Sequence, residues 1–290
     1  MKVRKAVIPA AGLGTRMLPA AKACPKEMMP IVDKPVMHYQ IEEAVKSGIT
    51  DILIITARGK EQIEDYFDYS LEYEGALQKK EKYEEIERLR DIAKMANVYF
   101  IRQKEAKGLG HAVLTAKEFV GNEPFAVLYG DDLIESDYPT TRSLIEIYEK
   151  YGKAVAGVKR VPLESISKYC SLKVEEAEDR IFYCSDMIEK PTPDKVMSPY
   201  SILGRVLLTP DIFPLLEKAK PGFGGEIQLT DSMAEIARSV GMMAYEFPGV
   251  HHDMGSKLGL IKANITYGLK HPEIKDELKA WLKEINKTLS

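Results

Sequence analysis

Residues 8–30 form the stretch whose residue types and spacing could do chemistry, IPAAGLGTRMLPAAKACPKEMMP. It begins in a short apolar segment typical of a buried strand and then turns through AAGLGTR at residues 10–16. Small residues and two glycines let that backbone approach a ligand closely and present consecutive N–H groups to an anion. Arg16 and Lys26 add two cations that can reach phosphates. A strand, a Gly-rich turn and two cations are the parts that a nucleotidyl-transfer site needs.

Two other phosphate-binding patterns fail on this stretch. The dinucleotide-binding pattern GxGxxG needs a third glycine where Met17 stands, and the P-loop pattern GxxxxGK(S/T) does not occur in the sequence. A Gly-rich turn without a ligand is the remaining alternative. The segments Thr15-Arg16 and Pro25-Lys26-Glu27 weigh against it, because a turn that binds nothing has no need of these cations.

The stretch resembles the signature of the sugar-nucleotide pyrophosphorylases, AAGxGTR followed by PKxM and by a proline–hydrophobic–x–x–Lys–Pro segment, here PIVDKP at 30–35. Five later segments fit one branch of that family, the bacterial-type UTP–glucose-1-phosphate uridylyltransferases. They are RQ at 102–103 with AKGLGHA at 106–112, GDD at 130–132, EKP at 189–191, GEIQLTD at 225–231 and HDMG at 252–255. All six occur in the family's order, which makes the resemblance specific.

The resemblance implies in-line attack by a sugar 1-phosphate oxygen on the α-phosphorus of UTP, with release of pyrophosphate. Because the nucleophile is already an anion, catalysis would depend on positioning and on cancelling charge repulsion. It implies that Arg16 and Lys26 hold the triphosphate, and that Lys190 holds the sugar phosphate. Asp131 and Asp253 match the family's ligands for Mg²⁺, which needs only one or two carboxylates besides phosphates and waters.

The resemblance also implies which residues bind the two substrates, UTP and a sugar 1-phosphate. Gln103 would read uracil, since an amide offers both a donor and an acceptor, and a solvated strand end is its alternative. The implied nucleotide-binding residues are Ala10, Ala11, Gly12, Gly14, Thr15, Gln103, Gly108 and Asp132. The implied sugar-binding residues are Cys170, Glu189, Lys190 and Gly204.

Four residues in or near these segments have a second interpretation. Asp132 could instead cap the following turn. His251 and His252 suggest zinc, but adjacent residues of a strand point to opposite faces, so structural histidines are favoured. Cys24 could be a low-pKa thiol near Lys26, and a small buried hydrophobic residue is the favoured interpretation.

The sequence departs from the family pattern in its sugar half. Cys170 stands where the family has glycine, and Pro199-Tyr200-Ser201 stands where asparagine is usual. A thiol that crowds the sugar predicts that Cys170→Gly improves kcat/KM for glucose 1-phosphate, whereas a thiol in the core predicts a loss of stability. These departures leave open another sugar 1-phosphate, such as that of N-acetylglucosamine or galactose, a low-activity paralogue, or a non-catalytic UDP-sugar sensor.

The elements that must position these residues alternate between strand and helix. Strands are predicted at Val3–Ala10, Asp51–Thr56, Asn97–Gln103 and Phe125–Gly130, and helices at Pro35–Ser47, Gly108–Phe119 and Thr141–Tyr151. This alternation predicts an α/β fold with a Rossmann-like, mostly parallel central sheet flanked by helices. Ligands bind at the carboxyl ends of such strands, where the Gly-rich turn and GDD both lie.

Three further segments complete the predicted organisation. Residues 58–96 are a charged helical insertion, packed on the sheet or else a lid or an oligomer contact. Residues 153–209 are predicted to form a smaller mixed β part, which the resemblance implies binds the sugar, within a nucleotidyltransferase domain at 1–271. Residues 272–290 are predicted to form a C-terminal helix whose apolar stripe either mediates self-association into a dimer or tetramer, as the resemblance implies, or packs back on its own domain.

Composition excludes several classes of protein. A net charge of −3 with no basic block disfavours nucleic acid as a partner, and no apolar run is long enough to span a membrane. The chain begins MKVRKAVIP, which shows no secretory signal. Three scattered cysteines suit neither a disulfide framework nor a zinc site, and they favour the cytoplasm. The absence of any dehydrogenase motif, together with Met17, disfavours an NAD-linked oxidoreductase.

Overall fold

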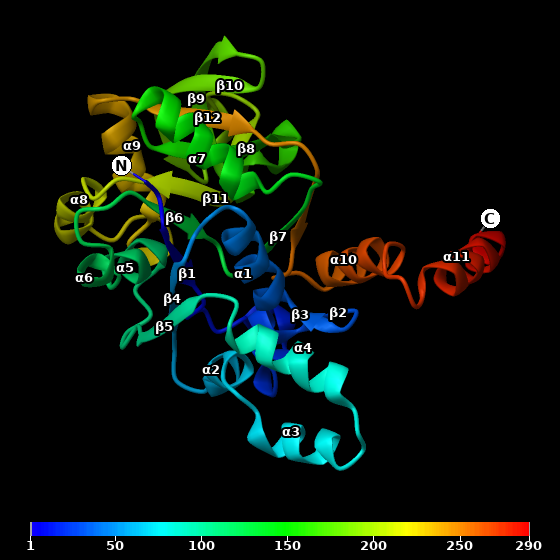
Figure 1. Cartoon of the computed structure of the whole chain (residues 1–290). Coiled ribbons are helices and arrows are strands. Elements are labelled where there is room, and N and C mark those ends of the chain that lie inside the picture. The colour runs from blue at the N-terminus through cyan, green and yellow to red at the C-terminus, as the bar shows by residue number, and fades with distance from the viewer. Residues whose placement is uncertain (1, 290) are drawn as a thin grey trace.

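A nine-stranded sheet forms the centre of the fold in a computed structural model that describes residues 2–289, and the side chains of residues 2–288. Its first strand carries a continuous apolar run, Ala6–Ile8, that is fully buried, as expected where helices cover both faces of a sheet. The strands lie in the spatial order β5 (Asn97–Arg102), β4 (Asp51–Thr56), β1 (Lys5–Pro9), β6 (Phe125–Leu128), β11 (Tyr200–Leu208), β8 (Val155–Arg160), β12 (Met242–Glu246), β10 (Ile181–Glu189) and β9 (Cys170–Glu178), as Figure 1 shows.

Strand directions confirm the predicted, mostly parallel sheet. β10 and β11 run opposite to the other seven strands. The strands of residues 153–209, β8 to β11, join this same sheet, so the predicted mixed β part is a continuation of the central sheet. β12 lies between β8 and β10 and was not predicted. The division of the chain at residue 271 stays a prediction.

Helices cover both faces of the sheet, because alternate strand residues point to opposite sides. Val7 faces one buried cluster with α5 (Leu109–Leu114), α8 (Ile212–Lys218) and α9 (Leu229–Ser239). Ala6 and Ile8 face a second cluster with α1 (Val36–Lys46) and α7 (Thr140–Tyr151). The single helix predicted at 108–119 is two helices, α5 and the short α6 (Lys117–Val120).

The insertion at residues 58–96 consists of three helices, α2 (Glu61–Phe67), α3 (Leu71–Gln78) and α4 (Tyr83–Ala93). Ile63 and Phe67 of α2 belong to the core, and Ile92 of α4 packs against it. This agrees with the favoured prediction of an insertion packed on the main body. α3 lies at the outer tip of the insertion (Figure 1), with Tyr73 70% exposed.

The C-terminal segment forms two helices, α10 (Lys257–Gly268) and α11 (Lys275–Leu289). α10 packs through Ala263 against a small cluster that includes Ile31. α11 projects away from the sheet in Figure 1, and none of its side chains through residue 288 is buried. α11 lies against the end of α10, where a Cβ placed on Gly268 would be 2.6 Å from Leu278 Cδ2, and its part in self-association stays a prediction.

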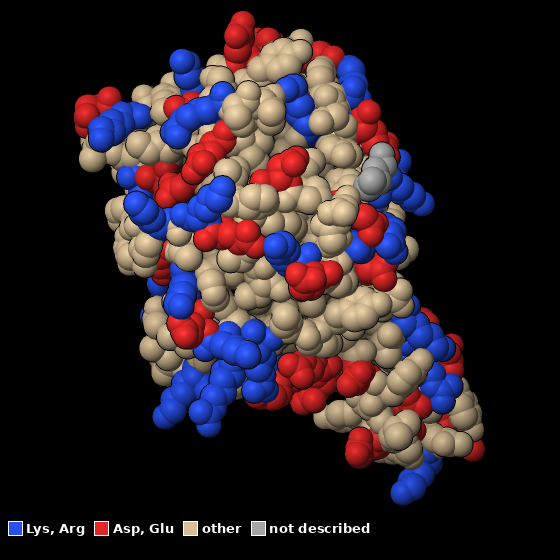
Figure 2. All heavy atoms as spheres, turned by 90° about the vertical axis from the view of Figure 1, so that its left-hand side faces the viewer, with Lys and Arg blue, Asp and Glu red and all other residues tan. Residues whose placement is uncertain are grey.

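Two features of the surface bear on possible partners. Figure 2 shows acidic and basic side chains interspersed over the face that it displays, with one gathering of Lys and Arg near the lower left edge. That mixture agrees with the small net charge of −3. In the described part of the chain, we find no helix with the length and apolar character needed to cross a membrane.

Candidate active site

The Gly-rich turn at the end of β1 wraps around the side chain of Lys26. Gly14 has a φ of 66° and precedes a single helical turn at Thr15–Met17, so the chain reverses in the left-handed region that glycine favours. A Cβ placed on Gly12 would lie 3.8 Å from Lys26 Nζ, and one on Gly14 would lie 3.6 Å from Lys26 Cδ. The two glycines therefore bring the backbone close to this ammonium.

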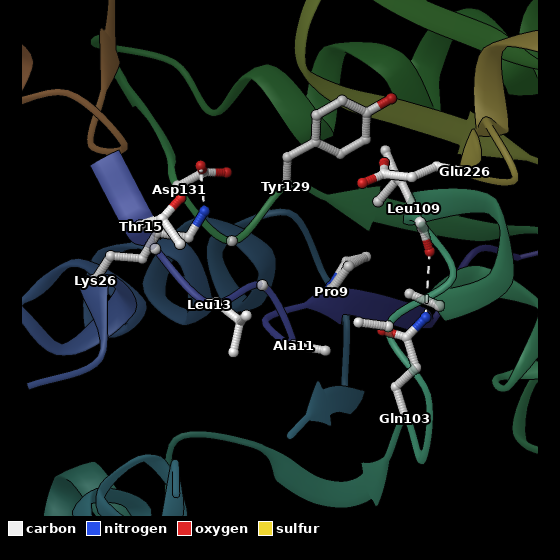
Figure 3. Close-up of a pocket in the computed structure, with 16 residues that line it drawn as sticks. Pro9, Ala11, Leu13, Thr15, Lys26, Gln103, Leu109, Tyr129, Asp131 and Glu226 are labelled. Atoms are coloured by element: carbon white, nitrogen blue, oxygen red, sulfur yellow. Dashed lines mark hydrogen bonds and ion pairs between the residues drawn. The ribbon is translucent and has the colours of Figure 1, made fainter. Parts of the chain in front are cut away.

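The turn forms one wall of a cavity of about 440 Å³ at the carboxyl ends of the parallel strands (Figure 3). Gln103 lies at one end of this cavity, and Lys26 and Asp131 lie together at the other. Predicted site residues that line it are Ala11, Gly12, Gly14, Thr15, Lys26, Gln103, Gly108 and Asp131. Ala10 lies beneath the turn, 1% exposed, and is not part of the lining.

Gln103 and Gly108 shape the far end of this cavity in different ways. The Gln103 amide nitrogen donates to the Gly108 carbonyl at 3.2 Å and lies 2.8 Å from His111 Nδ1, which fixes the amide. Gly108 has a φ of 100°, and a Cβ there would lie 2.7 Å from Glu226 Cβ. The absence of a side chain at Gly108 thus lets the cavity wall at Glu226 approach closely.

Asp131 and Asp253 converge although they are far apart in the sequence. Asp253 ends β13 (Val250–Asp253), which pairs with β7 (Asp132–Glu135) so that Asp253 lies opposite Asp132. A Cβ placed on Gly255 would lie 2.9 Å from both Asp131 Oδ2 and Asp253 Oδ1. In residues 2–289 no cluster of three or more His, Cys, Asp or Glu side chains suited to a metal occurs, so these two carboxylates form a sparse site.

The two predicted cations lie against these carboxylates. Lys26 Nζ is 2.5 Å from Asp131 Oδ2, and Arg16 lies 3.5 Å from Asp253 and 4.0 Å from Asp131. Burial raises the pKa of Asp131, but Lys26 and Arg16 outweigh it and the net pKa is lowered. Burial raises the pKa of Asp253, and the Arg16 guanidinium does not fully offset it. Asp131 is thus the more firmly ionised of the two.

A second cavity, of about 750 Å³, adjoins the first and shares Leu109, Tyr129 and Asp131 with it. Predicted site residues that line it are Arg16, Asp131, Asp132, Cys170, Glu189, Lys190 and Asp253. Glu189 accepts a hydrogen bond from Thr230 at 2.9 Å, and burial raises its pKa. Lys190 Nζ lies 4.6 Å from the centre of the Phe223 ring.

Asp132 and Gly204 do not lie where the resemblance implied, which was at the nucleotide for Asp132 and at the sugar for Gly204. Asp132 lines the second cavity, where it lies 2.5 Å from His251 Nε2, and is not among the residues that line the first cavity. Gly204, with a φ of 85°, lines neither cavity, and a Cβ there would lie 2.6 Å from Asp132 Cβ. His252 is 4% exposed on the opposite side of β13, as strand alternation predicted.

The thiol of Cys170 points toward β11. Its Sγ accepts a hydrogen bond from the Ile202 amide at 3.3 Å and lies 3.4 Å from the Ser201 hydroxyl, and the residue is 5% exposed. This geometry favours the core alternative over a thiol that crowds a sugar. For Cys24, burial and the Glu27 carboxylate raise the thiol pKa, which argues against the low-pKa interpretation.

Sequence reasoning missed three residues at the site. Tyr129 forms the boundary between the two cavities, and Glu27 and Lys60 form a buried ion pair, 2.8 Å apart, beneath the Gly-rich turn. Tyr129 directly precedes GDD. Lys60 follows the end of β4, so the rule that ligands gather at strand ends could have identified it.

Comparison with known proteins agrees with this geometry. The model of the nucleotidyl transferase family matches residues 5–268. A UTP–glucose-1-phosphate uridylyltransferase of Bacillus subtilis is 49% identical over 286 residues, which cover 99% of this chain and 96% of the relative. The same enzyme of Staphylococcus haemolyticus is 47% identical over 284 residues, 98% of this chain and 99% of the relative.

Solved structures extend the likeness to the whole fold. A UDP-glucose pyrophosphorylase complexed with UDP-glucose has a TM-score of 0.83 and 41% identity, over 93% of this chain and 100% of the other. A UTP-bound enzyme of Acinetobacter baumannii has a TM-score of 0.87 and 38% identity, over 97% of this chain and 99% of the other. The predicted family is confirmed. The chain belongs to the nucleotidyl transferase family, in the branch of the bacterial UTP–glucose-1-phosphate uridylyltransferases.

Proposed function

We propose that this chain transfers UMP from UTP to glucose 1-phosphate, giving UDP-glucose and pyrophosphate. The observation that carries the proposal is the pair of cavities that adjoin at Asp131. The Gly-rich turn and Lys26 line one cavity, and Glu189 and Lys190 line the other. A triphosphate in the first and a sugar phosphate in the second would meet at their boundary, which places the two reactants for direct transfer.

The transfer itself needs no covalent enzyme intermediate. A sugar phosphate oxygen attacks the α-phosphorus of UTP, and the bond from that phosphorus to the departing pyrophosphate breaks. Because the attacking oxygen is already an anion, no general base is required. Lys26 and Arg16 lie at the boundary of the cavities and would offset the charge of the phosphates, which is the main electrostatic task of such a site.

Mg²⁺ is the proposed cofactor, with Asp131 and Asp253 as its protein ligands. The donor set fits the ion, because two carboxylate oxygens converge and Mg²⁺ is commonly held by one or two carboxylates together with substrate phosphates. When bound, the ion would supply positive charge to the phosphate oxygens. Lys26 contacts the carboxylate of Asp131 and Arg16 lies beside that of Asp253.

Uracil would lie at the Gln103 end of the nucleotide cavity. With the phosphates at Lys26, the length of the cavity leaves the base beside Gln103 (Figure 3). The bonds from Gln103 to Gly108 and His111 hold the amide in place, so its polar atoms are positioned before the base arrives. A fixed amide suits the imide edge of uracil, which presents both a donor and acceptors.

Glucose 1-phosphate is the proposed second substrate. Lys190 carries a cation into the second cavity, and Glu189 offers a carboxylate that can accept hydrogen bonds from sugar hydroxyls. Cys170, the departure that had put glucose in doubt, turns its thiol toward β11. Two curated relatives at 47–49% identity are named for glucose 1-phosphate, which supports the same choice here.

The test is pyrophosphate release from UTP and Mg²⁺ with a panel of sugar 1-phosphates. We expect glucose 1-phosphate to give the highest kcat/KM, above galactose 1-phosphate and N-acetylglucosamine 1-phosphate. Faster turnover with either of the other two sugars would replace glucose as the substrate. UDP-glucose binding without release of pyrophosphate from any sugar would make the protein a sensor and overturn the proposal.

We further propose that the chain forms a homo-oligomer, a dimer or tetramer, through α11. This helix stands clear of the sheet in Figure 1 and carries Trp281 at 54% exposure. Light scattering on the full chain tests the idea, with Trp281→Glu expected to shift the mass toward the monomer. Tyr73→Glu on α3, which is also exposed, is the matched control. A monomeric wild-type protein would remove the basis of this proposal.

The proposed location is the cytoplasm. Cys24, Cys170 and Cys184 are all free thiols. Reducing compartments keep thiols in this state, and UTP and sugar phosphates are intracellular metabolites. Fractionation of cells with an antibody to the chain would test the location.

A further inference from the structure

A buried ion pair lies directly beneath the Gly-rich turn and takes no direct part in the proposed reaction. Lys60 Nζ lies 2.8 Å and 3.0 Å from the two carboxylate oxygens of Glu27. The side chains are 8% and 1% exposed. Burying two charges is costly and often contributes little to stability compared with apolar residues of similar volume, so stability alone does not explain the pair.

The ammonium of Lys60 has a third acceptor, the main-chain carbonyl of Ala10. Ala10 is 1% exposed and begins the turn whose following residues line the nucleotide cavity. When a turn presents its N–H groups to an anion on one side, its carbonyl groups point away and need donors of their own. Lys60 supplies that donor, and its three N–H groups match the three oxygens around it.

Glu27 connects the same ammonium to the two other parts of the phosphate end. It lies in the helical turn Lys26–Met28, directly after the lysine that contacts Asp131. A Cβ placed on Gly130 would lie 3.4 Å from Glu27 Cγ, so the Glu27 side chain lies beside the backbone that precedes Asp131. The pair therefore lies next to three segments at once: the Gly-rich turn, the segment that carries Lys26, and the loop that carries Asp131.

We infer that Lys60 and Glu27 are positioning residues for the triphosphate of UTP, and this inference rests on the proposed function. They hold the Gly-rich turn and Lys26 at a fixed distance from each other. Neither side chain lines the nucleotide cavity, so both act through the groups above them. Displacing catalytic groups by about 1 Å can cost on the order of 100-fold in rate, which sets the scale of the effect.

The test replaces both charges with apolar side chains of similar length, Glu27→Met with Lys60→Met. Removing both partners avoids leaving one buried charge unpaired, so we expect the double variant to fold, as judged by circular dichroism and its melting temperature. We expect the KM for UTP and the equilibrium Kd for UTP each to rise by about tenfold or more. The KM for glucose 1-phosphate should change by less than about threefold, because the pair lies away from the sugar side.

A matched control removes a different ion pair in the same way. Arg90 and Glu74 pair at 2.9 Å within the insertion, and neither lines the two cavities. Glu74→Met with Arg90→Met should leave both UTP constants within about twofold of wild type. Lys60→Arg keeps donors for Ala10 and Glu27, and it should recover most of the affinity for UTP that the double variant loses.

The outcomes separate this inference from the proposed function. If wild type binds UTP but transfers nothing to glucose 1-phosphate, the proposed function fails while the Kd for UTP still tests the pair. A folded double variant whose KM and Kd for UTP stay within about twofold of wild type would overturn the inference. Should the double variant not fold, Glu27→Gln with Lys60→Met gives the same comparison, because neither replacement leaves a buried charge unpaired. An unchanged Kd for UTP in that variant would also overturn it.

Discussion

Replacing Cys170 with glycine tests whether the departure from the family pattern affects the sugar or the core. The sequence pattern alone predicts that Cys170→Gly opens the sugar site and improves kcat/KM. The structure instead predicts a loss of stability without a gain in activity. The Cys170 thiol accepts a hydrogen bond from the Ile202 amide, and the residue belongs to the main apolar cluster. We expect Cys170→Gly to destabilise the fold and to leave the KM for glucose 1-phosphate unchanged.

The size of the loss follows from three effects of the substitution. Deleting the buried Cβ and Sγ removes about two methylene equivalents from the core, roughly 1.6 kcal/mol. Losing the acceptor for the Ile202 N–H costs roughly 1 kcal/mol more, and a glycine inside a strand costs roughly 0.5–1 kcal/mol. The free energy of unfolding should therefore fall by roughly 3–4 kcal/mol, which for 290 residues corresponds to a drop of about 5–7 °C in Tm.

A thermal melt and steady-state kinetics on one preparation decide whether Cys170 affects sugar binding or the stability of the core. Cys184→Gly is the matched control, since Cys184 is 1% exposed on the neighbouring strand β10 and lines neither cavity. Both variants should lose a similar amount of stability and keep the sugar KM of wild type. If Cys170→Gly alone raises kcat/KM for glucose 1-phosphate several-fold without lowering the Tm, the reasoning from the hydrogen bond to Ile202 is refuted.

Three further predictions concern the reacting groups. Asp131→Ala and Asp253→Ala should each lower kcat by about 100-fold or more in a folded protein, as should EDTA with wild type; near-native rates in both variants would remove them as ligands of Mg²⁺. Gln103→Ala should raise the KM for UTP and reduce discrimination against CTP, because a site built to pair polar groups rejects a base that leaves them unpaired, and unchanged nucleotide preference would place base recognition elsewhere. Burial raises the pKa of Glu189, so its carboxylate is protonated at a higher pH than a free glutamate, and the KM for glucose 1-phosphate should rise as the pH falls toward that raised pKa. Glu189→Gln should flatten that part of the pH profile, and a profile unchanged in Glu189→Gln would assign the effect to another group.

The elements could be predicted where local pattern decides them. The apolar run Asp51–Thr56 is β4 with the predicted bounds, and the helix predicted at Thr141–Tyr151 differs from α7 by one residue. The order of strands in the second half of the sheet could not be predicted, because β12 enters between β8 and β10 through long-range pairing with residues far away in the sequence. The hydrophobic pattern of a segment predicts whether it forms a strand or a helix, but not which strands lie beside it in the sheet.

The candidate site shows the same division between local and long-range information. The motifs identify the segments that meet, since the carboxyl ends of parallel strands share one edge. They do not give the direction of each side chain. Asp131 and Asp132 are adjacent, yet one lies against Lys26 and the other against His251. Those directions depend on the pairing of β7 with β13, which brings together residues more than a hundred positions apart.

The two predicted cations, Lys26 and Arg16, differ in how exposed they are and in how closely they contact the carboxylates. Lys26 is 14% exposed and held 2.5 Å from Asp131, whereas Arg16 is 66% exposed and lies 3.5 Å or more from either carboxylate. An exposed ion pair contributes little free energy, so Arg16 can exchange a carboxylate for a phosphate at little cost. Lys26 is fixed by the turn around it and by the buried neighbours beneath it. In the proposed reaction the site thus combines one cation that keeps its position with one that can turn from the carboxylates to the phosphates.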